Sequence, residues 1–242
     1  SESHGLDSGG LTKVVDMLAK ELFKYNYSSL ILTEASEKTL ILEEKNVIRF
    51  NKSKIKDILS KTTRSKLKSI MITNHIKLVH LHGFWRPLHL VMAKAAFELD
   101  IPVILTPHGM LEPWALNNNG LIKAIKKNIY LSLLALHTFK KVTRIHAVTQ
   151  SECRNLKRLF PDAKVSVITN SIEVRNKFLP DLYVEKKYLF FIGRITQKKG
   201  VDLLVNAFAD SNLSKSNVKL FIAGAVEDIT YEKYLLKLIK EH

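Results

Sequence analysis

The chain has 242 residues, 46% of them hydrophobic, which is enough to bury the core of one large domain or two smaller ones. It carries 38 Lys and Arg residues against 23 Asp and Glu residues, and the net charge of +15 suits three kinds of partner: a nucleic acid, an anionic membrane surface or an anionic substrate. No apolar run approaches the roughly 20 residues that a bilayer-crossing helix needs, and the composition is not that of a disordered chain.

The basic residues are spread along the chain and thicken at 52–68, 123–127 and 198–199. No zinc finger, RNA-recognition signature or long basic helix accompanies them, so no nucleic-acid partner is expected. The single cysteine, Cys153, cannot form a disulfide within the chain. It therefore fits a reducing compartment and favours a cytoplasmic location.

Short apolar runs alternate with segments of helical spacing. Runs rich in Val, Ile, Leu and Phe are typical of parallel strands buried on both faces, and they lie at 29–33, 78–81, 103–106, 145–149, 165–169, 188–192 and 219–223. Amphipathic helices are predicted between them, at 12–24, 87–99, 121–139, 150–159, 200–208 and 231–239. The alternation predicts an α/β fold of right-handed βαβ units with doubly wound parallel sheets.

The stretch 171–187 interrupts this rhythm with Pro180, several charges and little periodicity. A domain boundary is placed there, so that residues 1–176 form a first Rossmann-like domain and 177–242 begin a second. The glycine-rich start resembles a loop that follows a strand, so the first strand is expected to be missing. Residues 177–242 hold too few βα units for a complete domain, so the second domain is expected to be truncated.

Gly9 and Gly10 stand directly before the first predicted helix. Paired glycines let a backbone approach a ligand closely, and the free N–H groups of a helix start attract phosphate. An ordinary loop in which Ser8 or Thr12 caps the helix explains the same residues. Both interpretations stay open on local grounds.

Histidines mark the ends of two predicted strands. His108, between Pro107 and Gly109, follows the strand 103–106, and His82 follows the strand 78–81. Ligands of open α/β sheets bind at the carboxyl ends of strands, where His108 could contact a substrate hydroxyl or a developing charge. His80 and His82 alternate and should share a face, but no third ligand stands at a useful spacing, so no metal site is expected.

A cationic pair follows the strand 188–192. Gly193 and Arg194 end this strand, and Lys199 stands just before Gly200 and the next helix. Arginine supplies forked donors and lysine a point charge, a combination that suits a diphosphate. Gly224 ends the strand 219–223, where it could let a nucleotide pack against the backbone.

Taken in order, these motifs resemble the retaining GT-B glycosyltransferases of glycosyltransferase family four, also called group 1 glycosyl transferases. The resemblance extends over nearly the whole chain, and the run 108–116 resembles a subgroup found in bacterial surface-polysaccharide assembly. It is carried by Gly9-Gly10, His82-Gly83 and the stretches 106–109, 145–152, 167–172, 193–200 and 221–224.

The resemblance implies a GT-B fold of two Rossmann-like domains, and a reaction that moves a sugar from a nucleoside-diphosphate sugar to a glycan or polyprenyl-linked acceptor with retention and without a metal or cofactor. His108 would contact the transferred sugar. Arg194 and Lys199 would hold the diphosphate. The other implied donor-side residues are Gly10, Gly193 and Gly224, and the acceptor-side residues are Gly9, His82 and Gly109.

The chain departs from the family pattern in two places. Asn170 is followed by Ser171 instead of glycine, and the pair of glutamates that grips the donor in the second domain has no counterpart in these residues. The resemblance therefore leaves the activity of this length of chain open.

The predicted helix 121–139 sets Lys123, Lys126 and Lys127 beside Ile125 and Ile129. A basic amphipathic helix can lie on an anionic bilayer, as a polyprenyl-linked acceptor would require, and it can equally pack on a sheet with a wet lysine edge. A cytoplasmic protein bound peripherally to the inner membrane face is expected in the first case.

Two rival functions are a GT-B sugar-nucleotide epimerase and a basic nucleotide- or nucleic-acid-binding module. Carboxylates poised for the elimination chemistry of an epimerase are not evident in the sequence. The binding module predicts a steep salt dependence of binding to nucleic acid. Lipopolysaccharide, O-antigen or capsule assembly is the biological role expected for a glycosyltransferase of this subgroup.

Overall fold

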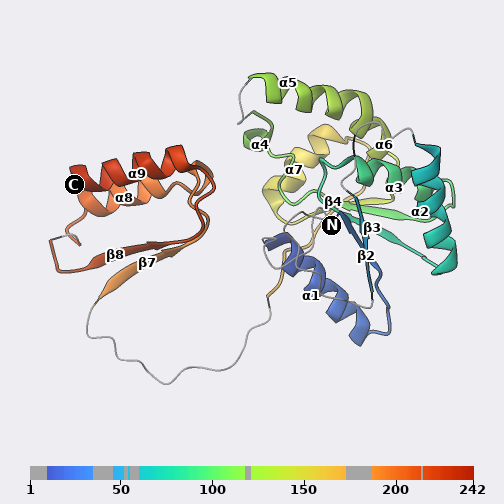
Figure 1. Ribbon diagram of the computed structural model, residues 1–242, viewed down its shortest axis with the longest axis horizontal. Coiled ribbons are helices and arrows are strands. Elements are labelled where there is room, and N and C mark those ends of the chain that lie inside the picture. The colour runs from blue at the N-terminus through green and yellow to red at the C-terminus, as the bar shows by residue number, and fades with distance from the viewer. Residues whose placement is uncertain are drawn as a thin grey trace. The chain divides into compact units, whose positions relative to one another are not determined.

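The computed structural model describes residues 10–34, 46–51, 54, 60–117, 121–172, 187–213 and 215–242, with the backbone alone at 117 and 121–124. The chain divides into two compact units, Ser1–Glu173 and Val174–His242. Each unit is built from parallel strands connected by helices (Figure 1).

The first unit contains a four-stranded parallel sheet in the order β3-β4-β5-β6. These strands are β3 (Val79–His82), β4 (Val103–Thr106), β5 (Arg144–Ala147) and β6 (Val165–Val167). A separate parallel pair is formed by β1 (Ile31–Glu34) and β2 (Val47–Phe50). The register sets His82 beside Thr106 and His146 beside Ser166, so the carboxyl ends of β3, β4 and β5 meet at one edge of the sheet.

The helices of this unit are α1 (Gly10–Lys24), α2 (Lys61–Thr73), α3 (Pro87–Phe97), α4 (Pro113–Asn117), α5 (Leu121–Tyr130), α6 (Leu136–Phe139) and α7 (Gln150–Leu159). Helix α3 is apolar on nearly every side and begins with Pro87 at its first position, where the missing N–H costs nothing. It is buried against β3, β4, α2 and α6, and so forms the centre of the hydrophobic core.

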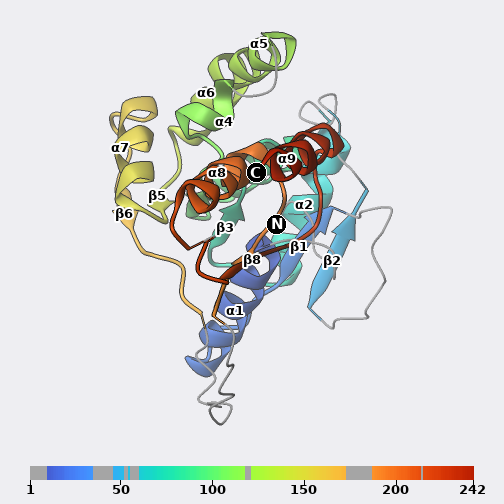
Figure 2. The same ribbon diagram turned by 90° about the vertical axis from the view of Figure 1, so that its left-hand side faces the viewer.

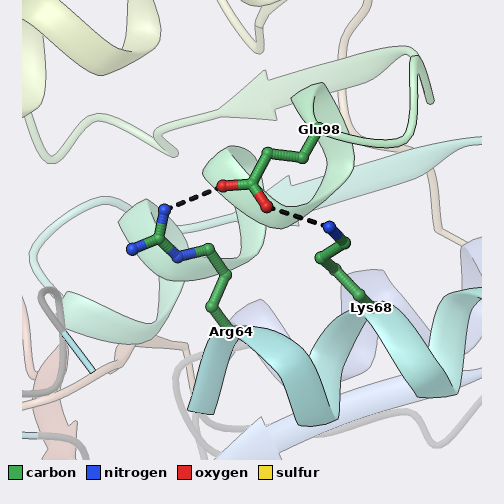
Figure 3. A network of polar contacts seen from close by, with 3 residues as sticks. All are labelled: Arg64, Lys68 and Glu98. Carbon is green, nitrogen blue, oxygen red and sulfur yellow. Dashed lines mark hydrogen bonds and ion pairs between the residues drawn. The ribbon is translucent and has the colours of Figure 1, made fainter. Parts of the chain in front are cut away.

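A three-residue ion network joins α2 to the end of α3 (Figure 3). The Glu98 carboxylate, at the C-cap of α3, accepts hydrogen bonds from Arg64 Nη1 at 2.8 Å and from Lys68 Nζ at 3.1 Å. These bonds, that of Arg64 first, hold the pKa of Glu98 below its ordinary value. Because the network is partly exposed, it contributes little to the free energy of unfolding.

One long helix carries a π-helical segment, η2 (Leu131–Ala135), between α5 and α6. Such segments interrupt α-helices as single wider turns. Leu131, Ala135 and Phe139 are buried in the core, whereas Ile125 and Ile129 of α5 face solvent. The helix predicted at 121–139 is therefore present, but it is not uniformly α-helical.

The second unit pairs β7 (Tyr188–Ile192) with β8 (Lys219–Ala223) in parallel. Helices α8 (Val201–Asp210) and α9 (Ile229–Glu241) lie side by side over one face of this pair, as Figures 1 and 2 both show. A short 3-10 turn, η3 (Gln197–Lys199), leads from β7 into α8. The small core is centred on Val201, Tyr231 and Leu235.

The α/β fold predicted from the alternation is confirmed. The predicted bounds agree at 103–106, 150–159, 188–192 and 219–223, and the predicted strand 145–149 ends early because Thr149 is the N-cap of α7. The sequence pattern missed β2, α2 and α4. Helix α2 is rich in Lys and Thr and buries only Leu67 and Met71, which is too weak an apolar stripe to stand out. In the described part of the chain, no helix is long and apolar enough to cross a membrane.

Candidate functional site

Four histidines gather at the carboxyl edge of the four-stranded sheet. His80 and His82 come from β3, His146 from β5, and His108 from the turn after β4. The rings of His80 and His82 lie 4.0 Å apart between centroids, which confirms that the two share a face, and the rings of His82 and His108 are stacked at 5.3 Å. In parallel sheets this edge is where ligands bind.

A chain of hydrogen bonds crosses three strands at this edge. The Thr106 hydroxyl lies 2.7 Å from His80 Nε2 and 3.0 Å from His146 Nδ1. His146 Nε2 in turn lies 2.7 Å from the carbonyl oxygen of Ile168. Thr106 is fully buried, so its hydroxyl is dedicated to this link. Sequence reasoning did not single out Thr106 and His146 as partners of His80.

His82 and His108, two residues predicted as part of the site, contact each other directly. His82 Nδ1 and His108 Nε2 are 3.0 Å apart, within hydrogen-bonding distance. His82 is buried, whereas His108 is partly exposed and so accessible to a ligand.

The turn that carries His108 has an unusual backbone. His108 and Gly109 both have positive φ, at 56° and 72°. The left-handed region is costly for a residue with a side chain and free of cost for glycine, so the turn needs support from its surroundings.

Glu152, at the start of α7, supplies that support. Its carboxylate is 2% exposed and accepts the backbone N–H of Gly109 at 2.6 Å and that of Val148 at 2.7 Å. The Thr149 hydroxyl caps the same helix by accepting the N–H of Glu152. Thr149-x-x-Glu152 is the sequence pattern of a capping box, and this pattern could have identified the residue.

A second contact from α7 holds the far end of the turn. The Asn155 side-chain amide donates to the Glu112 carboxylate, and Asn155 lies one helical turn after the N-terminal residues of α7. The turn 108–112 is therefore attached to α7 through both Gly109 and Glu112. Because α7 packs against β5 and β6, the turn is fixed relative to the sheet.

Three histidines of the cluster, His80, His82 and His108, are held in their neutral form. Burial lowers the pKa of His80 to about 4, and His146 and His108 add to the effect. Burial and then His146 lower the pKa of His108 to about 4 as well. The pKa of His82 lies still further below its ordinary value, first through burial and then through His80 and His108. At neutral pH these rings exchange hydrogen bonds without carrying charge.

Of the two glycines before the first predicted helix, the structure describes Gly10 and not Gly9. Gly10 is the first residue of α1 and is exposed, with open space around the position of an added Cβ. Gly9 lies outside the described residues. Thr12 is buried within the first turn of α1, so it is not the N-cap, and Ser8, the other residue that could cap the helix, lies outside the described residues. Gly10 is in the same unit as the histidine cluster.

In the second unit, the two glycines predicted at the donor side touch each other. A Cβ on Gly224, whose φ is +155°, would stand 1.7 Å from the carbonyl oxygen of Gly193. Only glycine fits that space. The loops after β7 and β8 then run alongside each other, with Gly193 N–H donating to Ala223 and Ile195 N–H donating to Ala225.

Arg194 has a partner that the sequence did not predict. Its guanidinium forms an ion pair with Glu227 on the neighbouring loop, and both side chains are largely exposed. Glu227 stands four residues after β8, where no motif drew attention to it. The Arg194 guanidinium is thereby oriented along the paired loops, with its remaining N–H donors available for an anion.

Lys199 is exposed at the end of η3, directly before α8. Gly200 has a φ of 61° and caps the start of α8 with its backbone alone. Tyr231 of α9 holds this helix start, because its hydroxyl donates to Asp202 Oδ1 at 2.6 Å and accepts the Asp202 N–H at 3.1 Å. Gly193, Arg194 and Lys199 are thus carried on one strand-turn-helix connection, and Gly224 adjoins it.

No metal centre is evident among the residues that the structure describes, since no three His, Cys, Asp or Glu side chains are placed to share an ion. Cys153 is buried in α7. The histidine cluster is linked by hydrogen bonds through Thr106.

An apolar stripe marks the outer face of the long helix. Ile125, Ile129 and Leu133 are 55%, 52% and 70% exposed and stand four residues apart, so they line one side; we call these three residues the α5 stripe. Trp114 on the adjoining α4 is 46% exposed. Lys127, predicted on the basic edge, instead turns inward, donating to the carbonyl of Ala115 at 2.6 Å and lying 5.3 Å from the ring centroid of Trp85.

Two protein-family models match the chain. The model described as Glycosyltransferase Family 4 matches residues 8–176, well over half of the sequence, and the model described as Glycosyl transferases group 1 matches residues 175–242. The chain belongs to glycosyltransferase family 4. Comparison of this family 4 chain with curated proteins gives no significant match.

Solved structures similar to this family 4 chain share its GT-B fold. MurG of Acinetobacter baumannii is 13% identical with a TM-score of 0.50, over 95% of this chain and 67% of its own. A putative UDP-N-acetylglucosamine 2-epimerase from Listeria monocytogenes is 13% identical with a TM-score of 0.57, over 97% and 65%. The UDP-GlcNAc 2-epimerase from Neisseria meningitidis, bound to UDP-GlcNAc, is 15% identical with a TM-score of 0.51, over 96% and 67%. This chain therefore spans about two thirds of the length of each, and the likeness at these identities concerns the fold.

Proposed function

We propose that this family 4 glycosyltransferase moves a sugar from a nucleoside-diphosphate sugar to a glycan or polyprenyl-linked acceptor, with retention of configuration and without a metal or cofactor. The observation that supports this best is the constrained His108 turn beside His82 at the ligand-binding edge of the sheet. A neutral His108 has one N–H, which can donate a hydrogen bond to a sugar oxygen without protonating it.

The donor diphosphate is assigned to the second unit. Arg194 supplies forked N–H donors and Lys199 a mobile point charge, both exposed at the connection from β7 to α8. The contact of Gly193 with Gly224 leaves bare backbone beside them, where a nucleotide can approach closely. Among the solved neighbours, the epimerase from Neisseria meningitidis is bound to UDP-GlcNAc and MnaA from S. aureus to UDP, which supports a nucleotide sugar as the donor here.

The proposed donor site is tested by an NMR titration of the isotope-labelled chain with UDP, GDP and ADP, which also detects weak binding. We expect amide shifts in the loops after β7 and β8, and a dissociation constant that rises about 10- to 150-fold in Arg194→Ala or Lys199→Ala. This range corresponds to the roughly 1.5–3 kcal/mol of a hydrogen bond to a charged group. Lys198→Ala is the control, because it removes an equal charge one residue earlier in η3. Equal affinities in all four proteins would overturn the proposal.

Two further titrations, one with an oligonucleotide and one with UDP-GlcNAc, distinguish this function from the two alternative functions. A nucleic-acid-binding module would bind an oligonucleotide better than a nucleoside diphosphate, with a steep salt dependence. A sugar-nucleotide epimerase would bind UDP-GlcNAc and convert it without an acceptor, which the proton spectrum of the sugar reports directly. Family 4 membership supports transfer over both.

The role proposed in the cell is assembly of lipopolysaccharide, O-antigen or capsule, at the cytoplasmic face of the inner membrane. The α5 stripe and Trp114 supply the apolar contact for a bilayer surface. The exposed Lys126 adjoins the stripe, and the chain's net charge of +15 favours anionic lipids.

Cosedimentation with vesicles of phosphatidylglycerol, compared with vesicles of phosphatidylcholine, tests the membrane contact at low salt. We expect binding to the anionic vesicles only, and its loss in the double variant Ile129→Gln and Leu133→Gln. Ile72→Gln is the control, because Ile72 is a similarly exposed apolar residue on α2. Failure of the wild-type chain to bind anionic vesicles would remove the membrane from the proposal and leave the donor site unaffected.

A further inference from the structure

Arg86 is a cation at the carboxyl edge of the four-stranded sheet that neither the histidine cluster nor the proposed diphosphate site uses. It lies in the loop that leaves β3 shortly after His82, and it is the N-cap residue of α3. Its side chain is 36% exposed, so it is accessible to a ligand. Ligands of parallel sheets bind at this edge.

The loop that carries Arg86 is anchored to the sheet and to α5. The Gly83 N–H donates to the carbonyl oxygen of Thr106 at 2.9 Å, and the Phe84 side chain is fully buried. The Tyr130 hydroxyl, at the end of α5, lies 3.5 Å from the carbonyl oxygens of Phe84 and of Arg86. The backbone of Arg86 is therefore held in place.

A buried carboxylate orients the Arg86 guanidinium. Glu34, the last residue of β1, is 3% exposed, and its Oε2 lies 3.7 Å from Nε of Arg86. A carboxylate buried to this extent needs a cation beside it, so the ion pair keeps the arginine at this place. The Arg86 side chain makes no hydrogen bond to any residue that the structure describes. Its two Nη groups are therefore available as a fork of N–H donors, which matches the oxygens of a phosphate.

Positive charge exceeds negative charge around this loop. Lys127 of α5 places its Nζ 5.3 Å from the ring centroid of Trp85, the residue before Arg86. The N-terminal end of α3, which carries a partial positive charge, begins directly after Arg86, and its first turn holds no acidic residue. The carboxylate of Glu34 balances one of these charges. The loop therefore favours an anionic ligand.

The α5 stripe lies on the outer side of the helix that supplies Lys127. Its residues face solvent, whereas Lys127 turns inward toward Trp85. From the stripe through α5 to the sheet, the order is an apolar surface, then Lys127 and Arg86, and then the contact of His82 with His108. A lipid-linked sugar has its groups in the same order: a hydrocarbon chain, a phosphate or pyrophosphate, and the sugar.

We propose that Arg86, assisted by Lys127, binds the phosphate or pyrophosphate that links the acceptor sugar to its lipid chain. The acceptor is then a sugar on a polyprenyl phosphate carrier and not a free neutral glycan. This inference rests on the proposed function and narrows the acceptor class that it leaves open.

An NMR titration of the isotope-labelled chain with farnesyl diphosphate, a soluble short-chain prenyl diphosphate, tests the inference. We expect shifts of the Trp85 indole N–H and of the Arg86 Nε–H, because both side chains lie at the proposed site. Farnesol, which lacks the phosphates, should shift neither signal. If farnesol binds as tightly as farnesyl diphosphate, or if farnesyl diphosphate shifts neither signal, the inference is wrong.

A further probe identifies the source of the phosphate. Glycerol 3-phosphate carries the phosphate of a membrane lipid headgroup without a prenyl chain, and it should bind more weakly than farnesyl diphosphate. Equal or tighter binding of glycerol 3-phosphate would assign Arg86 to the headgroups of membrane lipids and would overturn the assignment to the acceptor.

Substitution of Arg86 measures its contribution. Arg86→Gln alone leaves the buried Glu34 carboxylate without its cation, so it is combined with Glu34→Gln, which keeps the pair neutral. In this double variant the dissociation constant for farnesyl diphosphate should rise about 10- to 150-fold, as expected for the loss of a hydrogen bond to a charged group. Arg86→Lys keeps the charge and loses the fork, so its affinity should lie between those of the double variant and the wild type.

Two controls accompany these variants. Glu34→Gln alone removes the carboxylate and keeps the arginine, so it should not weaken the binding of farnesyl diphosphate. Arg154→Gln removes an equal charge from an exposed position on α7. If the double variant binds farnesyl diphosphate as tightly as Arg154→Gln does, Arg86 does not bind the phosphate.

A parallel titration with UDP keeps this inference apart from the proposed function. UDP is assigned to Arg194 and Lys199, so its affinity should be the same in the wild type and in the double variant. If UDP does not bind the wild type but farnesyl diphosphate binds in a manner that depends on Arg86, the proposed donor site is wrong and the prenyl phosphate site stands. If the double variant weakens the binding of UDP and of farnesyl diphosphate equally, Arg86 is a donor contact and the inference is overturned.

Discussion

The carboxylate of Glu152 accepts the backbone N–H of Gly109 at 2.6 Å, although the two residues are 43 positions apart in the sequence. A single buried side chain on α7 thus holds the left-handed turn that presents His108. The same carboxylate accepts the N–H of Val148, so the start of α7 and the turn after β4 share one acceptor group.

Removal of this carboxylate should destabilise the first unit. In Glu152→Ala the N–H groups of Gly109 and Val148 lose their acceptor, and we expect a loss of about 3–5 kcal/mol in the free energy of unfolding. Glu152→Gln should fall between alanine and wild type, because an amide has one oxygen to accept with. Urea unfolding followed by tryptophan fluorescence measures this, since Trp85 and Trp114 both lie in the first unit. Glu21→Gln, on the exposed face of α1, is the control, and a Glu152→Ala variant as stable as this control would contradict the assignment.

The Thr106 hydroxyl should matter more than its methyl group. Thr106→Val keeps the volume of the side chain but breaks both hydrogen bonds to His80 and His146, which should cost at least about 1–3 kcal/mol in the free energy of unfolding. Thr106→Ser keeps the hydroxyl and loses one buried methyl group, at about 1 kcal/mol. The same fluorescence-detected unfolding measures both variants. If Thr106→Ser lost as much free energy of unfolding as Thr106→Val, or more, packing of the methyl group and not the hydrogen bonds would determine the stability.

Gly224 should tolerate no side chain. The Cβ of Gly224→Ala would overlap the carbonyl oxygen of Gly193, so the paired loops after β7 and β8 must separate. We expect amide shifts throughout these loops and weaker binding of nucleoside diphosphates. Gly10→Ala is the comparison for folding, because its added Cβ meets open space at the start of α1. Superimposable spectra of wild type and Gly224→Ala would show that the close contact is not retained in solution.

Glu227 competes with an anionic ligand for Arg194. In Glu227→Gln the guanidinium is released from its ion pair, and the affinity for a nucleoside diphosphate should rise by up to about fivefold, since exposed ion pairs contribute about 0.2–1 kcal/mol. Glu232→Gln, in the first turn of α9, removes the same charge elsewhere in the unit and is the control. A fall in affinity specific to Glu227→Gln would mean that Glu227 orients the arginine for binding.

The first unit should unfold at a higher pH than protonation of its carboxylates alone would cause. Burial lowers the pKa values of His80 and His108 to about 4, from 6.5 in the unfolded chain, and lowers that of the buried His89 to about 3. The unfolded state therefore binds protons first, so stability is full above pH 6.5 and is lost as the pH falls toward 4. Each such histidine contributes a slope of up to about 1.4 kcal/mol per pH unit.

The slope of the free energy of unfolding against pH shows which histidines cause the loss of stability in acid. The titratable groups that face His80 are His82, His108 and His146, all within the cluster. His89 lies in α3 and is not part of the histidine cluster. In His89→Gln the slope of the free energy of unfolding against pH should fall by the contribution of one histidine. The NMR signals of the histidine rings in the cluster should stay unchanged. A free energy of unfolding that does not change between pH 6.5 and pH 4 would contradict the burial of His80, His108 and His89 as neutral rings.

The sequence predicts the elements of this fold better than the contacts between them. Apolar runs such as 188–192 and 219–223 are bounded by glycine, and the structure keeps their limits. Helix α2 was missed because its Lys-rich sequence buries little, and its attachment to α3 through Glu98 depends on charges that periodicity does not register.

For the candidate site too, the residues could be predicted from the sequence better than the contacts between them. His82, His108 and Gly109 could be placed at strand ends from local pattern, and the structure brings them together in one cluster. The partners that constrain them could not be found by spacing, because Glu152 and His146 reach the site from the next strand and helix along the sheet. In the second unit, Glu227 faces Arg194 only because β7 and β8 are neighbours in parallel register.

The π-helical segment η2 sets which side of the long helix meets water. A π turn holds one residue more than an α turn, and one residue rotates everything beyond it by about 100° around the axis. Upstream of η2 the residues Ile125 and Ile129 point outward, while downstream Phe139 is fully buried. Deleting a single residue such as Ser132 would turn α5 by this angle against the core, drawing part of the exposed apolar stripe inward. The extra residue in η2 thus allows one continuous helix to pack in the core at its C-terminal end and to expose apolar side chains at its N-terminal end.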